Sequence, residues 1–385
     1  METPYKISVP DSSLTNLRQK LELVRFPDEI DDAGWDYGVP LKDLQRLVAR
    51  WKDGYEWRKH EKLLNDELPQ FTRDIEVDGF GVLNIHYVHK KSQVTENAIP
   101  LLFVHGWPGS FIEVRKILPL LNEGTPSFHV VAVGLPGFGF SEGAKKKGFS
   151  INQYAEVAHK LMMFLGYNEY VTQGGDWGYI ITRTIAAKYG PTHAKAWHTN
   201  VQFGSKPEND NPDAYTEAEK AGIERGNLAD SPVGVLAWIF EKLVNWTDGY
   251  PWNDDEGHFS RIYEKRTKLI DWFAVLTWIS IYWFSRSGPA ASVRIYYEYQ
   301  AAGGRAKFLS AEPVIPLGNS YFPKELWVPP RSWINDKNLV FESQHDSGGH
   351  FAAHEKPKEL AEDLQKMFRQ GGPAFGVVPS HNGYA

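Results

Sequence analysis

The feature that most constrains the fold of this 385-residue chain is a series of short, uninterrupted apolar runs separated by helix-length segments. The series begins with "AIPLLFVHG" (98–106) and "FHVVAVGLPG" (128–137), and it continues with "EYVTQGG" (169–175) and "HAKAWHTN" (193–200). Runs of this kind form parallel strands that are buried on both faces. Strand and helix alternating along the chain predict an α/β fold with a mostly parallel sheet and helices on both of its faces.

The alternation stops between residues 202 and 305, where helical, Trp-rich segments carry no strand pattern. Strands resume at "PVIPLGN" (313–319) and "NLVFES" (338–343), and a last helix is predicted over 357–370. Residues 1–70 have helical spacing, and 71–92 alternate like a hairpin around Asp78-Gly79. We therefore expect an N-terminal segment (1–92), a first core part (93–201), a helical lid (202–305) and a second core part (306–385).

The charge and composition exclude several classes of function. A net charge of -6 without a basic stripe argues against nucleic acid or an acidic membrane as partner. The chain has no cysteine, which excludes disulfides, a Cys nucleophile and Cys-ligated metals. No N-terminal signal pattern is visible, and the most apolar stretch (269–284) is too short to span a bilayer. We interpret that stretch as a buried helix and expect a cytoplasmic protein; a homodimer is a candidate assembly that the sequence does not decide.

An acid occupies the sharpest junction of the chain, Gly174-Gly175-Asp176-Trp177-Gly178, directly after a predicted strand and before a predicted helix. Strand–Gly-x-nucleophile-x-Gly–helix is typical of a nucleophile elbow, in which small neighbours let a strained turn pack closely. The alternative is that Asp176 is only a helix N-cap, a position where Asp is common.

A second turn, "HGWPGS" (105–110), follows another apolar strand. It can direct the backbone N–H of Trp107 at the same point as the N–H of Trp177, and two such donors would form an oxyanion hole. The alternative is an ordinary strand-to-helix loop with Pro and Gly.

The segment "DSGGHFAAHEKP" (346–357) offers a base after the last predicted strand. We select His350, which lies on a glycine-rich loop, and assign His354 to the following helix. A metal site on these two histidines is disfavoured, because no Glu follows the first in the HExxH manner and no third ligand is evident.

An acid that orients the histidine is expected between nucleophile and base in chain order. The candidates are Glu325, Asp336 and Asp346. Asp336 resembles a turn residue, and Asp346 shares the loop of His350 and can cap it. We favour Glu325, because it follows the strand predicted at 313–319 and so should lie at the carboxyl edge of the sheet.

The identity of the elbow residue selects the chemistry. A serine that attacks a saturated carbon forms a stable ether, whereas a carboxylate forms an ester that a His-activated water can hydrolyse. Asp176 therefore indicates displacement at saturated carbon, with halide or the alkoxide of an opened epoxide as leaving group.

At this level the chain resembles the microsomal-type epoxide hydrolases and their fungal and bacterial relatives. The resemblance is carried by "GGDWG", "HGWPGS", "GGHFAAHEKP", "SYFPKELW" and "DSPVGVLAWIFEK" (230–242), and by an N-terminal segment similar to that family's meander. It implies the α/β-hydrolase fold, with Asp176 as nucleophile, His350 as base and Glu325 as its acid partner. It also implies a small hydrophobic epoxide as substrate, a vicinal diol as product, and neither cofactor nor metal.

The resemblance further implies lid tyrosines that protonate the epoxide oxygen. "ASVRIYYEYQ" (291–300) is similar to the family segment that supplies one of them, and its alignment points to Tyr296. Tyr297 and Tyr299 are the alternatives to Tyr296, and the aromatic face of this helix could serve packing alone. In the family, a second tyrosine lies in the segment that corresponds to the residues before 230. That segment is shortened in this chain, and Tyr215 is nearby but out of register with the family position.

Three other functions stay open at this stage. A haloalkane dehalogenase shares the Asp-Trp pair, although the Trp-Pro turn and the N-terminal segment favour the epoxide family. The shortened lid is compatible with an enzyme that opens epoxides to cyclised or isomerised natural products. A non-catalytic ligand-binding protein is disfavoured, because it has no use for a positioned nucleophile.

Overall fold

The computed structural model describes residues 2–201, 231–250, 252, 275–308, 310, 312–327 and 336–385. In these residues nine strands form one sheet in the order β1-β2-β3-β5-β4-β6-β7-β8-β9. The strands are β1 (Thr3–Pro4), β2 (Gln70–Val77), β3 (Gly81–Lys90), β4 (Ile99–Val104), β5 (Phe128–Val133), β6 (Tyr170–Gly174), β7 (Ala194–Thr199), β8 (Leu317–Tyr321) and β9 (Leu339–Gln344).

The six strands from β5 across to β9 are parallel to their neighbours, which confirms the mostly parallel sheet expected from the apolar runs. All residues of β4 and β5 are buried, as such runs require. Strand β8 begins at Leu317, four residues later than predicted. Pro313 and Pro316 explain the shift, because a proline has no N–H to donate to a sheet ladder.

The predicted hairpin is present and extends the same sheet on its antiparallel side. β2 and β3 pair from Gln70↔Val88 to Val77↔Gly81, and β3 then pairs antiparallel with β5. The turn contains Asp78, Gly79 and Phe80, and the N–H of Phe80 donates to the carbonyl of Val77 at 2.9 Å. The short β1, which the sequence pattern did not indicate, adds to β2 at the edge.

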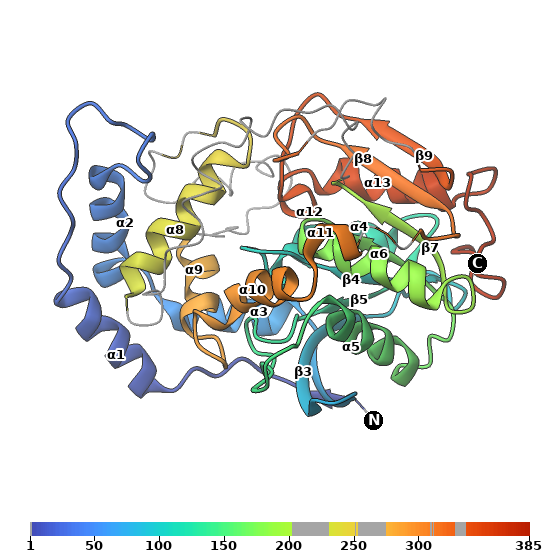
Figure 1. Cartoon of the computed structure of the whole chain (residues 1–385), viewed down its shortest axis with the longest axis horizontal. Coiled ribbons are helices and arrows are strands. Elements are labelled where there is room, and N and C mark those ends of the chain that lie inside the picture. Colours follow the sequence, from blue (N-terminus) through green and yellow to red (C-terminus); the bar gives the residue numbers. More distant parts are fainter. Residues whose placement is uncertain are drawn as a thin grey trace.

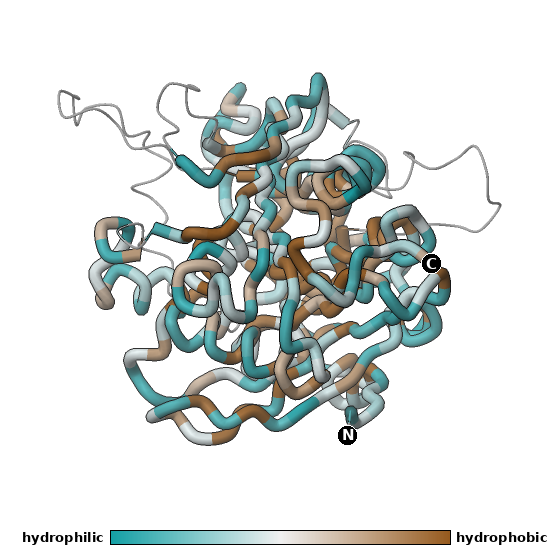
Figure 2. The backbone as a smooth tube through the Cα atoms, turned by 90° about the vertical axis from the view of Figure 1, so that its right-hand side faces the viewer, coloured by the Kyte–Doolittle hydropathy of each residue, from teal (hydrophilic) through white to brown (hydrophobic). Residues whose placement is uncertain are grey.

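Two groups of helices flank the sheet (Figure 1). α5 packs with α6 in one group, and α4 packs with α12 and α13 in the other. Their bounds are α4 (Val114–Glu123), α5 (Ile151–Phe164), α6 (Trp177–Tyr189), α12 (Ala352–Glu355) and α13 (Pro357–Phe368). In Figure 2 the hydrophobic stretches gather in the interior and the hydrophilic ones lie mainly on the periphery.

The N-terminal helices pack on the helical insertion. α1 and α2 contact α8, which lies between them and the sheet (Figure 1), and α3 contacts α9. Hydrogen bonds also join them: Arg46 Nη2 donates to the carbonyl of Trp252 (2.8 Å), and the hydroxyls of Tyr55 and Thr277 are 3.0 Å apart. The helices are α1 (Asp11–Glu22), α2 (Leu41–Asp53), α3 (Trp57–Glu67), α8 (Pro232–Asn245), α9 (Val275–Trp283), α10 (Arg294–Ala301) and α11 (Gly304–Phe308), with short 3-10 turns η1 (Phe111–Glu113) and η4 (Ala291–Val293).

The apolar stretch interpreted as a buried helix contains α9, whose residues from Val275 to Tyr282 are all buried. Residues 269–274 of that stretch lie outside the described residues. In the part of the chain that the structure describes, every helix is too short or too polar to cross a membrane.

Helix α6 begins very close to strand β4. A Cβ atom built on Gly178 would lie 2.0 Å from the carbonyl oxygen of Val104, and one on Gly174 would lie 2.7 Å from the backbone of Gly178. Only glycine therefore allows the strand and the helix to approach as they do, which is the packing reason for the glycines around Asp176.

We predict that Gly178→Ala lowers the free energy of unfolding by roughly 1–3 kcal/mol, because the methyl group must push α6 away from β4. Gly249→Ala is the matched control, since its Cβ meets no atom of the described residues within 4 Å and its φ is not positive. Urea unfolding of both variants measures the difference. Equal stability of the two would show that the close approach is not a constraint.

Candidate active site

Asp176 lies at the junction of β6 and α6 with φ +52°, a left-handed conformation that non-glycine residues rarely adopt. It occupies the N-cap position of α6, yet its side chain makes no capping hydrogen bond with that helix's second or third N–H. The carboxylate points instead toward the turn that follows β4. The conformation and this direction favour the elbow interpretation over a simple helix cap.

The turn after β4 contacts the carboxylate of Asp176. The backbone N–H of Trp107 donates to Asp176 Oδ1 at 2.7 Å, and the backbone N–H of the adjacent Trp177 also lowers the pKa of this carboxyl group. Gly106 leaves room for this contact, because a Cβ atom there would lie 2.3 Å from Asp176 Oδ1. The two N–H groups expected from the sequence therefore meet at one carboxylate.

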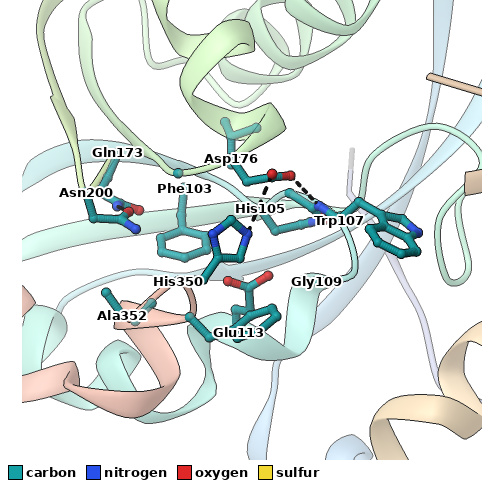
Figure 3. A pocket seen from close by; sticks show the side chains of 15 residues that line it. Phe103, His105, Trp107, Gly109, Glu113, Gln173, Asp176, Asn200, His350 and Ala352 are labelled. Atoms are coloured by element: carbon teal, nitrogen blue, oxygen red, sulfur yellow. Dashed lines mark hydrogen bonds and ion pairs between the residues drawn. The ribbon is translucent and has the colours of Figure 1, made fainter. Parts of the chain in front are cut away.

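His350 lies on the other side of Asp176, as Figure 3 shows. Its Nε2 is 3.6 Å from Asp176 Oδ2, and its Nδ1 is 2.6 Å from Glu325 Oε1. The His350 and Glu325 side chains are almost completely buried, whereas 22% of the Asp176 side chain is exposed. The ring is thus fixed by Glu325 at one nitrogen and faces Asp176 with the other.

The three candidate acids occupy different surroundings. Glu325 follows β8 and contacts His350 directly. Asp336 accepts a hydrogen bond from the N–H of Asn338 (2.9 Å) at the turn before β9, and Asp346 is exposed. Of these three described residues, only Glu325 is in contact with the histidine. His354 belongs to α12, as expected.

The charges of this group shift the pKa values of its members. Burial raises the pKa of Asp176, and the charge of His350 and the two backbone N–H groups oppose the shift. For His350, burial alone would lower the pKa, but the charge and hydrogen bond of Glu325 and the charges of Asp176 and Glu113 outweigh it and raise the pKa to about 9. The unreacted site therefore favours an ionised Asp176 beside a protonated imidazole.

Aromatic side chains from the insertion surround this group. The ring centroids of Trp107 and Trp238 are 4.7 Å apart, and those of Trp246 and His350 are 4.9 Å apart. Tyr296 of α10 meets the ring of Trp177 edge-on at 4.8 Å. The space in front of Asp176 is therefore bordered by apolar rings, which suit an apolar ligand.

The three tyrosines of α10 face different surroundings. The pKa of Tyr296 is raised well above its usual value by burial and by the charge of Asp176, although 39% of the whole residue is exposed. Its hydroxyl end is thus the buried part and lies within the field of Asp176. Tyr299 is buried against Trp177, and Tyr297 is exposed. Tyr215 lies outside the described residues.

Sequence reasoning missed one acid of the site, Glu113 at the end of η1. It lines the same cavity as Asp176 and His350, and burial raises its pKa to about 8. Its place in "HGWPGSFIEV" gives no local signal, because a glutamate at the start of a helix ordinarily faces solvent. Only the folding of that segment beneath the turn brings it to the site.

Comparisons with known proteins identify the family of the chain. A family model described as epoxide hydrolase N terminus matches residues 2–114, and the alpha/beta hydrolase fold model matches residues 99–357. A putative epoxide hydrolase of Stigmatella aurantiaca is 36% identical, over 96% of this chain and 85% of its own length. Epoxide hydrolase 1 of Sus scrofa is 32% identical, over 94% of this chain and 88% of its own length.

Solved structures agree in fold and in coverage. The epoxide hydrolase of Aspergillus niger has a TM-score of 0.74 at 33% identity, covering 94% of this chain and 95% of that one. The juvenile hormone epoxide hydrolase of Bombyx mori has a TM-score of 0.77 at 26% identity, over 95% and 93%. By sequence along nearly its whole length, and by the fold that positions Asp176, the chain belongs to the epoxide hydrolase family of alpha/beta hydrolases.

Proposed function

We propose that the protein hydrolyses a hydrophobic epoxide to a vicinal diol through an ester of Asp176. The observation that carries the proposal is the position of this carboxylate: it accepts a hydrogen bond from the backbone N–H of Trp107 and lies 3.6 Å from an imidazole whose other nitrogen contacts Glu325. A carboxylate in this place can act as a nucleophile whose ester remains within reach of a base. The aromatic border of the site supports an apolar substrate.

In the first half-reaction an oxygen of Asp176 attacks a ring carbon of the epoxide, and the C–O bond of the ring breaks. The alkoxide that leaves is strongly basic, so it needs a proton donor. Tyr296 is the described residue that suits this role, because its hydroxyl lies near Asp176. The raised pKa keeps the phenol protonated until the strongly basic alkoxide forms.

Ester formation prepares the second half-reaction by changing the charge of the site. It removes the negative charge of Asp176, one of the contributions that raise the pKa of His350. The pKa of the imidazole therefore falls, and the neutral form required of a base becomes more accessible. Glu325 keeps the ring oriented and stabilises the cation that forms when His350 accepts a proton.

In the second half-reaction His350 takes one proton of a water molecule while the water oxygen attacks Cγ of Asp176. The N–H groups of Trp107 and Trp177 stabilise the oxyanion of the tetrahedral intermediate. The acyl C–O bond to the substrate then breaks, and His350 returns the proton to the departing alkoxide. The second proton of the water, which remains on the Asp176 carboxyl group, passes back to the Tyr296 oxygen, and the diol and the Asp176 carboxylate are released. No atom beyond those of one water is consumed.

The first prediction tests the covalent intermediate. Asp176→Ala should abolish diol formation, because the nucleophile is lost. His350→Gln should form the ester but hydrolyse it very slowly, so intact-protein mass spectrometry should detect an adduct equal to the mass of the epoxide. A panel of aryl and alkyl epoxides beside one chloroalkane defines the substrate class, and product analysis separates hydrolysis from rearrangement. Full activity of Asp176→Ala would exclude this mechanism.

The second prediction concerns the acid beside His350. Glu325→Gln should slow ester hydrolysis by about 10²-fold or more, because the imidazolium loses its charged partner. Asp336→Asn and Asp346→Asn should change the rate little, since neither contacts His350. Stopped-flow measurement of the hydrolysis step compares the three. The largest loss in Asp346→Asn would mean that the acid is misassigned.

The third prediction concerns proton donation to the leaving oxygen. Tyr296→Phe removes one hydroxyl and should slow single-turnover alkylation of Asp176 by roughly 10²-fold or more. Tyr297→Phe is the matched control on the same helix, because its side chain is exposed, and it should leave the rate unchanged. Tyr215→Phe should have little effect. A negligible loss in Tyr296→Phe would remove this residue from the mechanism.

A further inference from the structure

Glu113 places a third carboxyl group in the site, and the proposed roles of Asp176 and His350 leave it unused. The residue ends η1, directly after the turn that supplies the Trp107 N–H, and only 8% of it is exposed. Figure 3 shows its carboxyl group near the ring of His350, and both residues line the same cavity. Glu113 is thus part of the site by its position.

The carboxyl group of Glu113 packs against a glycine of the same turn. A Cβ atom built on Gly109 would lie 1.6 Å from Glu113 Oε1, so any side chain at residue 109 would displace this oxygen. The hydroxyl of Tyr282 donates to the carbonyl of Gly109 at 2.5 Å and fixes the turn. The absence of a side chain at Gly109 thus leaves room for the carboxyl group of Glu113, just as Gly106 leaves room for that of Asp176.

One oxygen of Glu113 is left without a protein partner. The backbone of Ser110 hydrogen-bonds to the carboxyl group, but Oε1 is buried and has no hydrogen-bond partner among the described residues. A buried acceptor without a partner is costly, and such groups ordinarily bind water or a ligand. The arrangement therefore calls for a small donor beside Oε1.

A cavity that Glu113 lines has the size of such a donor. The cavity lined by Asp176, His350, Glu113 and Gly109 has a volume of about 10 Å³. This is comparable to the smallest volume, about 10–15 Å³, that accommodates one water molecule. A single water there would have an acceptor at Glu113, a base at His350 and the carboxyl carbon of Asp176 as neighbours.

We propose that Glu113 Oε1 accepts a hydrogen bond from the water that hydrolyses the Asp176 ester and so orients that water for attack. One proton of the water points to Glu113, the other passes to His350 Nε2, and a lone pair of the oxygen is directed at Cγ of Asp176. The oxygen joins Cγ, the acyl C–O bond to the substrate breaks, and Glu113 is unchanged. This assignment rests on the two-step function proposed above and deepens its second step.

The electrostatics of the site favour the same timing. Burial raises the pKa of Glu113 to about 8; the charge of His350 opposes the shift, and that of Asp176 adds to it. Esterification of Asp176 removes that repulsion. The positive charge that His350 gains when it takes a proton from the water also lowers the pKa of Glu113, so the carboxylate form, which accepts hydrogen bonds, is favoured while the water attacks.

The test separates the two half-reactions in Glu113→Gln. The carboxamide replaces one of the two acceptor oxygens of Glu113 with an NH₂ group, and an NH₂ group cannot accept a hydrogen bond. We expect ester hydrolysis, followed by stopped flow and by quenched mass spectrometry, to fall by roughly 10-fold or more. The alkylation rate should stay the same.

Two further variants make the result specific. Gly109→Ala displaces Oε1 while leaving the glutamate in place, and it should slow hydrolysis in the same way. Glu61→Gln is the matched control: Glu61 is also 8% exposed, but its carboxylate contacts Val9 and Trp57 of the N-terminal segment, so both rates should be unchanged. Thermal unfolding of each variant accompanies the kinetics.

Three outcomes in Glu113→Gln would overturn the inference: equal losses in both steps with a lower melting temperature, a loss in alkylation alone, or unchanged hydrolysis of a normally formed ester. The absence of any ester in the unmodified enzyme would overturn the proposed function, and this inference with it. The kinetics therefore distinguish the failure of one from the failure of the other.

Discussion

The hydrogen bond from the Trp107 N–H to Asp176 is the contact on which the site depends. It joins two turns that follow neighbouring parallel strands, since Val104 at the end of β4 pairs with Gly174 at the end of β6. Asp176 can reach it only with a positive φ, and the backbones can approach only because Gly106, Gly174 and Gly178 have no side chain. The sheet register therefore determines where the carboxylate lies.

The charges of the site follow from this placement. A carboxylate held in a largely buried position needs a nearby cation. His350 supplies it at 3.6 Å, and Glu325 contacts the other nitrogen of the His350 ring. The distance is longer than a hydrogen bond, so the imidazole and the carboxylate are near each other without being joined. Under the proposed mechanism, loss of one negative charge on esterification converts His350 from counter-ion to base.

Much of this arrangement could be predicted from the sequence, because it depends on local rules. The apolar runs identified the parallel strands, and the glycines around Asp176 identified the sharp strand-to-helix junction. Chain order and the end of β8 pointed to Glu325, which contacts His350 in the structure. Tyr296 was reached through family resemblance, since three tyrosines within four residues of one helix cannot be separated by spacing alone.

Other features depend on contacts between distant segments, which no local pattern encodes. Glu113 reaches the site because Gly109 has no side chain, and the sequence "FIEV" alone resembles an ordinary helix start. The packing of α1 and α2 on α8 joins residues about 200 positions apart. The later start of β8 follows from two prolines within an otherwise apolar run.

The most direct test of the central claim, an ester of Asp176, is a single turnover in water enriched in oxygen-18 with enzyme in excess over epoxide. In the proposed mechanism the water oxygen joins Cγ of Asp176, and the oxygen that enters the diol comes from the carboxylate. The diol should therefore be unlabelled, and the peptide that contains Asp176 should gain the label. Label in the diol of the first turnover, with none in the protein, would mean that water attacks the epoxide directly and would contradict the account.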